Sequence, residues 1–238
     1  MHLSHVAIHP EKFPVTHHYP FNLAIFQQGA DLSLSSPVTF FNGENGTGKS
    51  TLLEAIADKC RIYSWQGMER ARFNKSPYER DFYKVISMRW TNGSVPGSYF
   101  SSRVFRNFAE ILDEWATSDP GILNYFGGRS LMKQSHGQSL MSFFTSRFRI
   151  KGIYLLDEPE TALSPKTQLE LMEILKAMGK AGHAQFIIAT HSPILLSCPE
   201  AVIYSFDRST LEPVPYKKTD CYRIYRKFIK GSGPCPSP

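Results

Sequence analysis

The sequence predicts an α/β fold with a mostly parallel core sheet. Two apolar segments, 153–156 and 186–189, run without polar alternation directly into polar residues, as buried parallel strands do. A third apolar segment, 37–42, leads through a glycine-rich turn into a helical segment at 51–58. Open α/β sheets bind ligands at the carboxyl ends of their strands. We therefore expect a ligand site where these three strands end.

The glycine-rich turn is a complete phosphate-binding loop. Residues 43–51 read Gly-Glu-Asn-Gly-Thr-Gly-Lys-Ser-Thr and fit the pattern G-x-x-x-x-G-K-[ST] at every fixed position. Its backbone N–H groups and the following helix N-terminus favour a phosphate group. We expect Lys49 to reach the β- and γ-phosphates and the Ser50 hydroxyl to bind Mg²⁺. The expected nucleotide-binding residues of the loop are Asn45, Gly46, Thr47, Gly48, Lys49, Ser50 and Thr51.

The second strand ends in two adjacent carboxylates. Asp157 and Glu158 follow the apolar run 153–156 directly. We expect Asp157 to hold Mg²⁺ beside Ser50, through a water, and Glu158 to orient and activate the attacking water. The alternative interpretation is a strand followed by an acidic helix cap. The phosphate loop elsewhere in the chain favours the interpretation that Asp157 and Glu158 act at a nucleotide.

The third strand ends at a histidine. Residues 185–193 read Gln-Phe-Ile-Ile-Ala-Thr-His-Ser-Pro, which puts His191 just past a buried strand. The chain has eight histidines, and one of them alone is weak evidence for a site. The position of His191 predicts that it lies next to Glu158, if the two strands are neighbours, and contacts the γ-phosphate.

Composition limits the class of protein. A chain of 238 residues, 42% hydrophobic, can build one substantial core or one core with an inserted lobe. The net charge of +6 allows contact with nucleic acid without requiring it. The four cysteines have no paired spacing, which favours a reducing compartment over a disulfide framework. No signal peptide or membrane-spanning stretch is evident, so we expect a cytoplasmic protein.

A short polar segment completes the pattern. Residues 135–139 read Ser-His-Gly-Gln-Ser and precede a predicted helix at 140–148. The segment is a second anion-binding helix start in one interpretation, and an ordinary cap by Ser135 or Ser139 in the other.

The order of phosphate loop, Ser-His-Gly-Gln, Asp-Glu strand, 162–165 (Ala-Leu-Ser-Pro) and Thr190-His191 resembles an ABC-type ATPase head. It is most similar to a family of small bacterial ATPases, often labelled AAA-type, with a Ser-His-Gly-Glu signature.

The resemblance implies a P-loop NTPase fold of the ABC-type head, with antiparallel edge strands and a smaller helical lobe. It also implies an ATP-bound homodimer that buries two nucleotides between its subunits. Carried over by position, Ser135 and Gly137 would face the nucleotide of the other subunit, and Ser164 would touch the opposite active site. The implied ligands are ATP and Mg²⁺. The residues expected to act in hydrolysis are Lys49, Glu158 and His191.

Two departures from this pattern concern the site. Gln138 stands where the family has glutamate, and no glutamine occurs from residue 67 to 133, where a lid glutamine is expected. Residues 101–103 (Ser-Ser-Arg) occupy that region by rough alignment. Arg103 either contacts phosphate or is solvated; the second interpretation is favoured.

The rest of the chain is expected to form one domain, 1–230, with a helical or irregular lobe at about 60–148 and a disordered end at 231–238. Residues 3–27 are expected to form edge strands beside the core sheet. Tyr19 and Phe21 either stack on adenine or, as favoured, pack in the core. Aromatic residues interleaved with arginines at 60–96 suggest nucleic-acid binding or, as favoured, a small aromatic core.

Further helices and one strand follow from periodicity. Helices are expected at 104–115 and 165–178, a strand at 201–206, and a last helix beginning at Thr219-Asp220. The last helix carries Tyr222, Tyr225, Phe228 and Ile229 on one face, and we expect it to pack on the head.

The predicted function is a soluble ATP hydrolase that dimerises when ATP binds, in DNA metabolism, defence or a stress response. Nucleic acid or an unidentified protein are its expected partners. The main alternative is the energy subunit of an ABC transporter, against which the missing lid glutamine argues. A toxin or nuclease module lacks a separate catalytic cluster. A degenerate head without turnover is at odds with the complete set Lys49, Asp157, Glu158 and His191.

Overall fold

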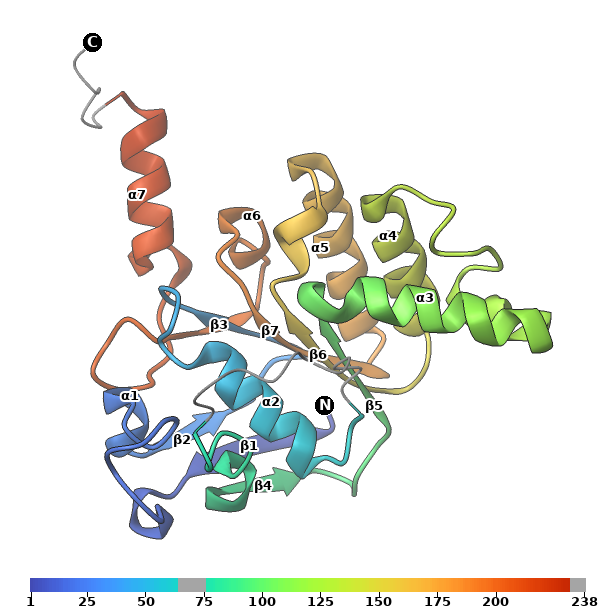
Figure 1. Ribbon diagram of the computed structural model, residues 1–238. Helices are drawn as coiled ribbons and strands as arrows, with labels where there is room; N and C mark the ends of the chain where they lie inside the picture. Colours follow the sequence, from blue (N-terminus) through green and yellow to red (C-terminus); the bar gives the residue numbers. More distant parts are fainter. Residues whose placement is uncertain (64–75, 232–238) are drawn as a thin grey trace.

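The computed structural model describes residues 1–63 and 76–231, which form two sheets and flanking helices (Figure 1). One sheet is antiparallel with strand order β2-β1-β4, and the other is parallel with order β5-β6-β7-β3-β8. The strands are β1 (Leu3–Ile8), β2 (Ala30–Ser33), β3 (Val38–Asn42), β4 (Ile86–Trp90), β5 (Gly97–Ser101), β6 (Gly152–Asp157), β7 (Ala184–Ala189) and β8 (Val202–Ser205).

The parallel sheet is the centre of the fold, as predicted. Every residue of β3, β6 and β7 is buried, which explains why these strands read as continuous apolar runs. β6 pairs with β7 in register from Gly152 opposite Ala184 to Asp157 opposite Ala189. β3 lies between β7 and β8. The polar residues that follow β3, β6 and β7 therefore meet at one edge of the sheet.

Helices cover the parallel sheet on both faces and make three layers. The helices are α1 (Ala24–Gln27), α2 (Lys49–Lys59), α3 (Ser102–Ser118), α4 (His136–Arg147), α5 (Pro165–Lys180), α6 (Pro193–Leu196) and α7 (Asp220–Ile229). Alternate residues of each strand point to opposite faces. Leu155 and Ile187 pack with α2 and the antiparallel sheet, whereas Leu156 and Ile188 pack with α3, α4 and α5.

The N-terminal region differs from the expected set of edge strands. Only residues 3–8 of the segment 3–27 form a strand, and β1 is the middle strand of the separate antiparallel sheet. Prolines explain the difference, because Pro10, Pro14 and Pro20 lack the N–H that a strand needs. Pro10 begins a short 3₁₀ turn instead.

Two strands were missed in the segment between the phosphate loop and Ser135. β4 joins the antiparallel sheet and β5 forms an edge of the parallel sheet. The helical lobe therefore begins after β5, with α3, the 3₁₀ turn at Pro120–Phe126 and α4. Tyr78, Phe82 and Trp90 pack into the core beneath α2, which supports the aromatic-core interpretation for this part of 60–96. Trp65, Phe73 and two of the arginines lie outside the described residues.

The last helix packs on the head only at its base, where it contacts α6 and the 3₁₀ turn Tyr216–Lys218. α7 begins where predicted, with the Thr219 hydroxyl accepting a hydrogen bond from the N–H of Tyr222, but none of its residues is buried. In Figure 1 it extends away from the sheet at one side of the molecule. No helix among residues 1–63 and 76–231 is long and apolar enough to span a membrane. Of the end predicted to be disordered, only Gly231 lies within the described residues.

Candidate nucleotide site

The phosphate loop lies between β3 and α2, and glycine is required at its end. Gly48 has φ of 105°, a conformation that other residues rarely adopt. A Cβ atom there would lie 2.7 Å from Cζ of Phe26. Both observations explain why the fixed glycine precedes Lys49. The loop is also held from outside, since Oδ1 of Asp207 accepts a hydrogen bond of 2.6 Å from the N–H of Glu44.

Lys49 is buried inside this loop. Its Nζ donates hydrogen bonds to the carbonyl oxygens of Gly43 at 2.6 Å and Glu44 at 2.8 Å. Burial lowers the pKa of Lys49, and the nearby carboxylates of Glu158, Asp207, Asp157 and Glu44 oppose that shift. An ammonium group held by carbonyl oxygens is placed to exchange them for a phosphate at the same end of the loop.

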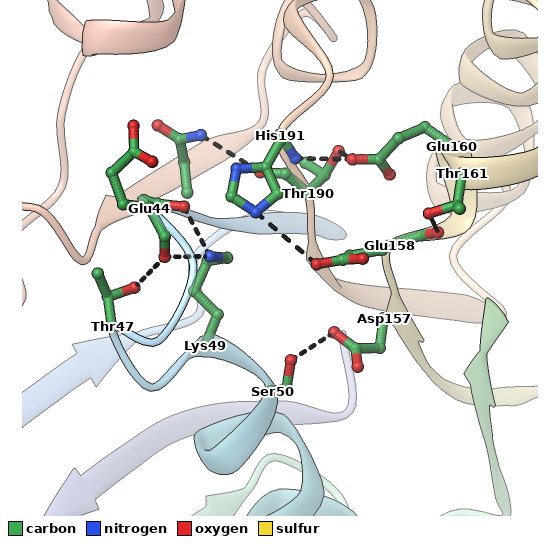
Figure 2. A network of polar contacts seen from close by, with 12 residues as sticks. Glu44, Thr47, Lys49, Ser50, Asp157, Glu158, Glu160, Thr161, Thr190 and His191 are labelled. Carbon is green, nitrogen blue, oxygen red and sulfur yellow. Dashed lines mark hydrogen bonds and ion pairs between the residues drawn. The ribbon is translucent and has the colours of Figure 1, made fainter. Parts of the chain in front are cut away.

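Ser50 and Asp157 meet across the site. The Ser50 hydroxyl donates a hydrogen bond of 2.9 Å to Oδ1 of Asp157 (Figure 2). One hydroxyl and one carboxylate fit Mg²⁺, which prefers oxygen ligands and usually keeps waters and substrate phosphates as its other ligands. The two side chains touch directly, and the expectation that Asp157 holds Mg²⁺ through a water stays a prediction. Ser101 stands opposite Asp157 in the parallel register, so the region that lacks the lid glutamine does border the site. The side chain of Arg103 is outside the described residues.

Glu158 and His191 face one another at the ends of neighbouring strands, as the sequence predicted. Nε2 of His191 lies 3.8 Å from Oε1 of Glu158, and both side chains are partly exposed. Figure 2 shows the pair above Lys49 and Asp157, pointing to the same space. Glu158 adopts a left-handed backbone conformation with φ of 49°, which is unusual for a residue other than glycine. Such outliers cluster at functional sites.

Sequence reasoning gave no role to Glu160, which the structure places behind His191. Its Oε1 accepts hydrogen bonds of 2.7 Å from the Thr190 hydroxyl and from the backbone N–H of His191. Asn42 at the end of β3 donates to the carbonyl oxygen of Thr190 at 3.2 Å, which fixes the same turn from the other side. The signal was present in the sequence, as a third carboxylate two residues after Glu158.

Ser135 and Gly137 lie at the start of α4, in the helical lobe. Ser135 caps the helix together with Gln138: each side chain hydrogen-bonds the other residue's backbone N–H. The structure shows the capping that one interpretation predicted for Ser135, and Gln138 serves as well as glutamate in this role. The anion-binding role of Ser135 stays a prediction. A Cβ on Gly137 would lie 3.3 Å from the carbonyl oxygen of Ala162, so this helix start packs closely on the loop before Ser164.

These lobe residues stand apart from the phosphate loop of their own chain. Within residues 1–63 and 76–231, no hydrogen bond joins Ser135 or Gly137 to residues 43–51. Asn45 and Gly46 are exposed at the tip of the loop. The Thr47 hydroxyl donates to the carbonyl oxygen of Glu44 at 2.9 Å. Thr51 is buried, and its hydroxyl lies 2.5 Å from that of Tyr19.

A cavity of about 450 Å³ adjoins the loop. Its lining includes Glu44, Thr47, Asp207 and Asp220. Phe21, considered as an adenine-stacking residue, is fully buried in the core, in agreement with the favoured interpretation. Tyr19 is 39% exposed.

Solved structures of ABC-type ATPase heads have the same fold as this chain. The structure resembles the SMC head domain from Thermotoga maritima with a TM-score of 0.51 and 16% identity, over 90% of this chain and 99% of the other. It also resembles a metal-chelate type ABC transporter in an inward-facing conformation, with a TM-score of 0.51 and 18% identity, over 94% of this chain and 88% of the other. The chain has the fold of an ABC-type ATPase head.

The sequence is similar to AAA-type domains and to the ATP-binding part of an ABC transporter. Residues 21–58 match a family model described as "AAA domain", and residues 138–197 match one described as "AAA domain, putative AbiEii toxin, Type IV TA system". The head is 26% identical over 204 residues to the macrolide export ATP-binding/permease protein MacB of Psychrobacter arcticus. The match covers 78% of this chain and only 30% of that relative.

Proposed function

We propose that this ABC-type head binds ATP with Mg²⁺, hydrolyses it, and pairs with a second copy when ATP is bound. The observation that carries the proposal is the convergence of Lys49, Ser50, Asp157, Glu158 and His191 at the ends of three adjacent strands. A phosphate loop, an oxygen pair that suits Mg²⁺ and a carboxylate beside a histidine are the parts that phosphoryl transfer to water requires.

The polar groups divide the work of hydrolysis. The loop N–H groups and Lys49 bind the phosphates and offset negative charge as the terminal phosphate leaves. Mg²⁺, when bound at Ser50 and Asp157, supplies further charge stabilisation. Glu158 orients a water for attack, and the proton of that water passes to the Glu158 carboxylate. His191 lies on the other side of the same space, where it can hydrogen-bond the terminal phosphate.

The second copy would complete the site from the lobe. α4 begins at Ser135 with a capping box and packs closely at Gly137 on the loop before Ser164. A helix N-terminus favours an anion. In the described part of the chain, no hydrogen bond joins this one to the phosphate loop of the same copy. A two-fold arrangement would bring each α4 start to the loop of the other copy. ATP binding would then favour the dimer, and hydrolysis would loosen it.

Light scattering of Glu158→Gln tests this function. The variant should bind ATP, hydrolyse it slowly and shift from monomer mass to dimer mass when ATP and Mg²⁺ are added. Adding Lys49→Ala to the same variant should leave it monomeric, which controls for association without nucleotide. A monomer with ATP bound would overturn the paired site, and absence of ATP binding would overturn the function as a whole.

The transporter alternative has one observation in its favour, the relationship to MacB. The chain spans about a third of that relative, which is named as an ATP-binding/permease protein. In this reading the head would drive a permease. Isolation of the chain from membranes together with a membrane protein would support the transporter function. ATP-dependent pairing of the isolated head would support the function as an ATP-dependent dimer.

A further inference from the structure

α7 exposes an apolar face that the rest of the head leaves uncovered. Ile224, Tyr225, Phe228 and Ile229 are 61%, 50%, 77% and 77% exposed. At about 100° per residue, these side chains fall with Tyr222 on one side of the helix, and the basic residues fall on the other side. The basic residues are Arg223, Arg226, Lys227 and Lys230. A helix so divided normally buries its apolar side against a partner.

The charge of this region selects an acidic partner. Residues 217–230 contain six lysines or arginines and one aspartate, which gives a net charge of +5. We call residues 217–230 the basic arm. Opposite charge on a partner would both attract and orient it.

The head itself carries a surface of the opposite kind. Residues 107–128, the far end of α3 and the turn after it, contain four acidic residues and no lysine or arginine. We call this stretch the acidic arm. It also exposes large aromatic side chains: Trp115 is 47% and Tyr125 is 65% exposed. Glu110 and Glu114 are also exposed and lie one turn apart on α3. The acidic arm therefore offers apolar surface that can pack against the basic arm, and a charge opposite to that of the basic arm.

The two arms belong to opposite edges of the parallel sheet. The acidic arm follows β5 and the basic arm follows β8, and these are the outer strands of the order β5-β6-β7-β3-β8. Four strand spacings separate them by about 19 Å. α7 packs on the 3₁₀ turn Tyr216–Lys218 and on α6, and Figure 1 shows α3 extending away on the other side of the molecule. The arms of one chain therefore do not meet.

The base of the basic arm lies at the nucleotide site. The Cys221 thiol donates a hydrogen bond of 3.2 Å to the carbonyl oxygen of His191. Asp220 lines the cavity beside Thr47 of the phosphate loop. α7 therefore begins at the edge of the sheet where the second copy would dock, and extends away from it.

We infer that the basic arm of each copy packs against the acidic arm of the other in the ATP-bound pair. The inference rests on the proposed function, because a lobe placed over the phosphate loop of the other copy would pass alongside α7. Two-fold symmetry makes the contact twice. The arms add apolar contact and charge pairing outside the nucleotide, so the dimer is held at its rims as well as at its centre.

Charge reversal in the Glu158→Gln background tests this contact. Lys227→Glu with Lys230→Glu alters the basic arm, and Glu110→Lys with Glu114→Lys alters the acidic arm. Each altered protein should bind ATP as its parent does, and its dimer dissociation constant should rise about tenfold or more. Asp31→Lys on β2, with Glu11→Lys in the 3₁₀ turn after β1, is the matched control and should leave dimerisation unchanged.

Mixing the two altered proteins distinguishes contact between copies from contact within one copy. Each homodimer has lost both arm contacts, whereas the mixed dimer keeps one, between the unaltered basic arm and the unaltered acidic arm. The mixture should therefore form dimer at ATP and protein concentrations at which neither protein does alone.

Three outcomes would overturn the inference. The first is that both altered proteins dimerise with the same dissociation constant as the parent. The second is that only the basic-arm change weakens the dimer, which would point to another anionic partner. The third is that mixing restores no dimer. Failure of the Glu158→Gln parent itself to dimerise would overturn the proposed function, and the arm contact with it.

Discussion

Glu160 holds the backbone of His191 through a hydrogen bond of 2.7 Å from the N–H to Oε1. The same oxygen accepts the Thr190 hydroxyl at 2.7 Å, so one carboxylate fixes the whole turn after β7. The imidazole of His191 is thereby kept 3.8 Å from Glu158, on the side of the site that faces the attacking water in the proposed mechanism. Glu160 is a positioning residue in this arrangement.

Glu160→Ala should lower kcat about tenfold, since misplacement of a catalytic group is costly, while the KM for ATP stays near that of the parent. It should also reduce the free energy of unfolding by about 1–3 kcal/mol, because two donors lose their acceptor. Glu160→Gln keeps an acceptor oxygen and should restore most of both losses. Equal kcat for the alanine variant and the parent would remove Glu160 from this role. Steady-state kinetics and urea unfolding measure the two effects.

Lys49→Ala should weaken ATP binding by about 100-fold or more, because it removes a buried charge-assisted contact to the phosphates. Titration calorimetry checks this. Lys59→Ala is the matched control, since Lys59 is an exposed lysine at the other end of the same helix. Tight ATP binding by Lys49→Ala would contradict the assignment of the loop.

Glu158→Gln should slow hydrolysis by about 100-fold to 10,000-fold, the usual contribution of a general base, while ATP affinity is kept or raised. Single-turnover hydrolysis with excess enzyme measures the chemical step directly. Glu170→Gln, on an exposed position of α5, is a suitable control. Unchanged turnover in Glu158→Gln would mean that another group orients the water.

Cys60 makes stability depend on pH in the alkaline range. Burial raises the pKa of its thiol from 9.0 to about 12. A thiol that ionises at lower pH in the unfolded chain favours unfolding once the pH exceeds its unfolded pKa. The stabilisation is complete below about pH 9 and is lost as pH rises toward 12, at roughly 1 kcal/mol per pH unit. Urea unfolding of the parent and of Cys60→Ala at several pH values should show a shallower decline for the variant.

The parallel sheet and the site at its edge were predictable because each rests on a local pattern. Buried strands such as β6 carry unbroken apolar runs, and a phosphate loop is defined by consecutive residues. Asp157 and Glu158 follow from their position after such a strand. The prediction that His191 lies beside Glu158 required only that β6 and β7 be neighbours, which the structure confirms.

What could not be predicted depends on long-range contacts. β5 has few apolar residues in its sequence, and only its pairing with β6 makes it part of the core sheet. β1 pairs with β4, about eighty residues away in the sequence, so its sheet was not evident from local pattern. α7 has the periodicity of a packed helix, but its sequence alone does not show that its apolar side chains stay exposed on this head.

Mixing two inactive variants tests whether two copies share each nucleotide site. Lys49→Ala lacks a working loop and Ser135→Arg lacks a working lobe, so each alone should hydrolyse ATP at background rates. In the mixed dimer the intact loop of one copy faces the intact Ser135 of the other. Mixing should therefore restore about half of the parental activity per mixed dimer. Normal hydrolysis by Ser135→Arg alone, or no recovery of activity on mixing, would show that the two copies do not share a nucleotide site.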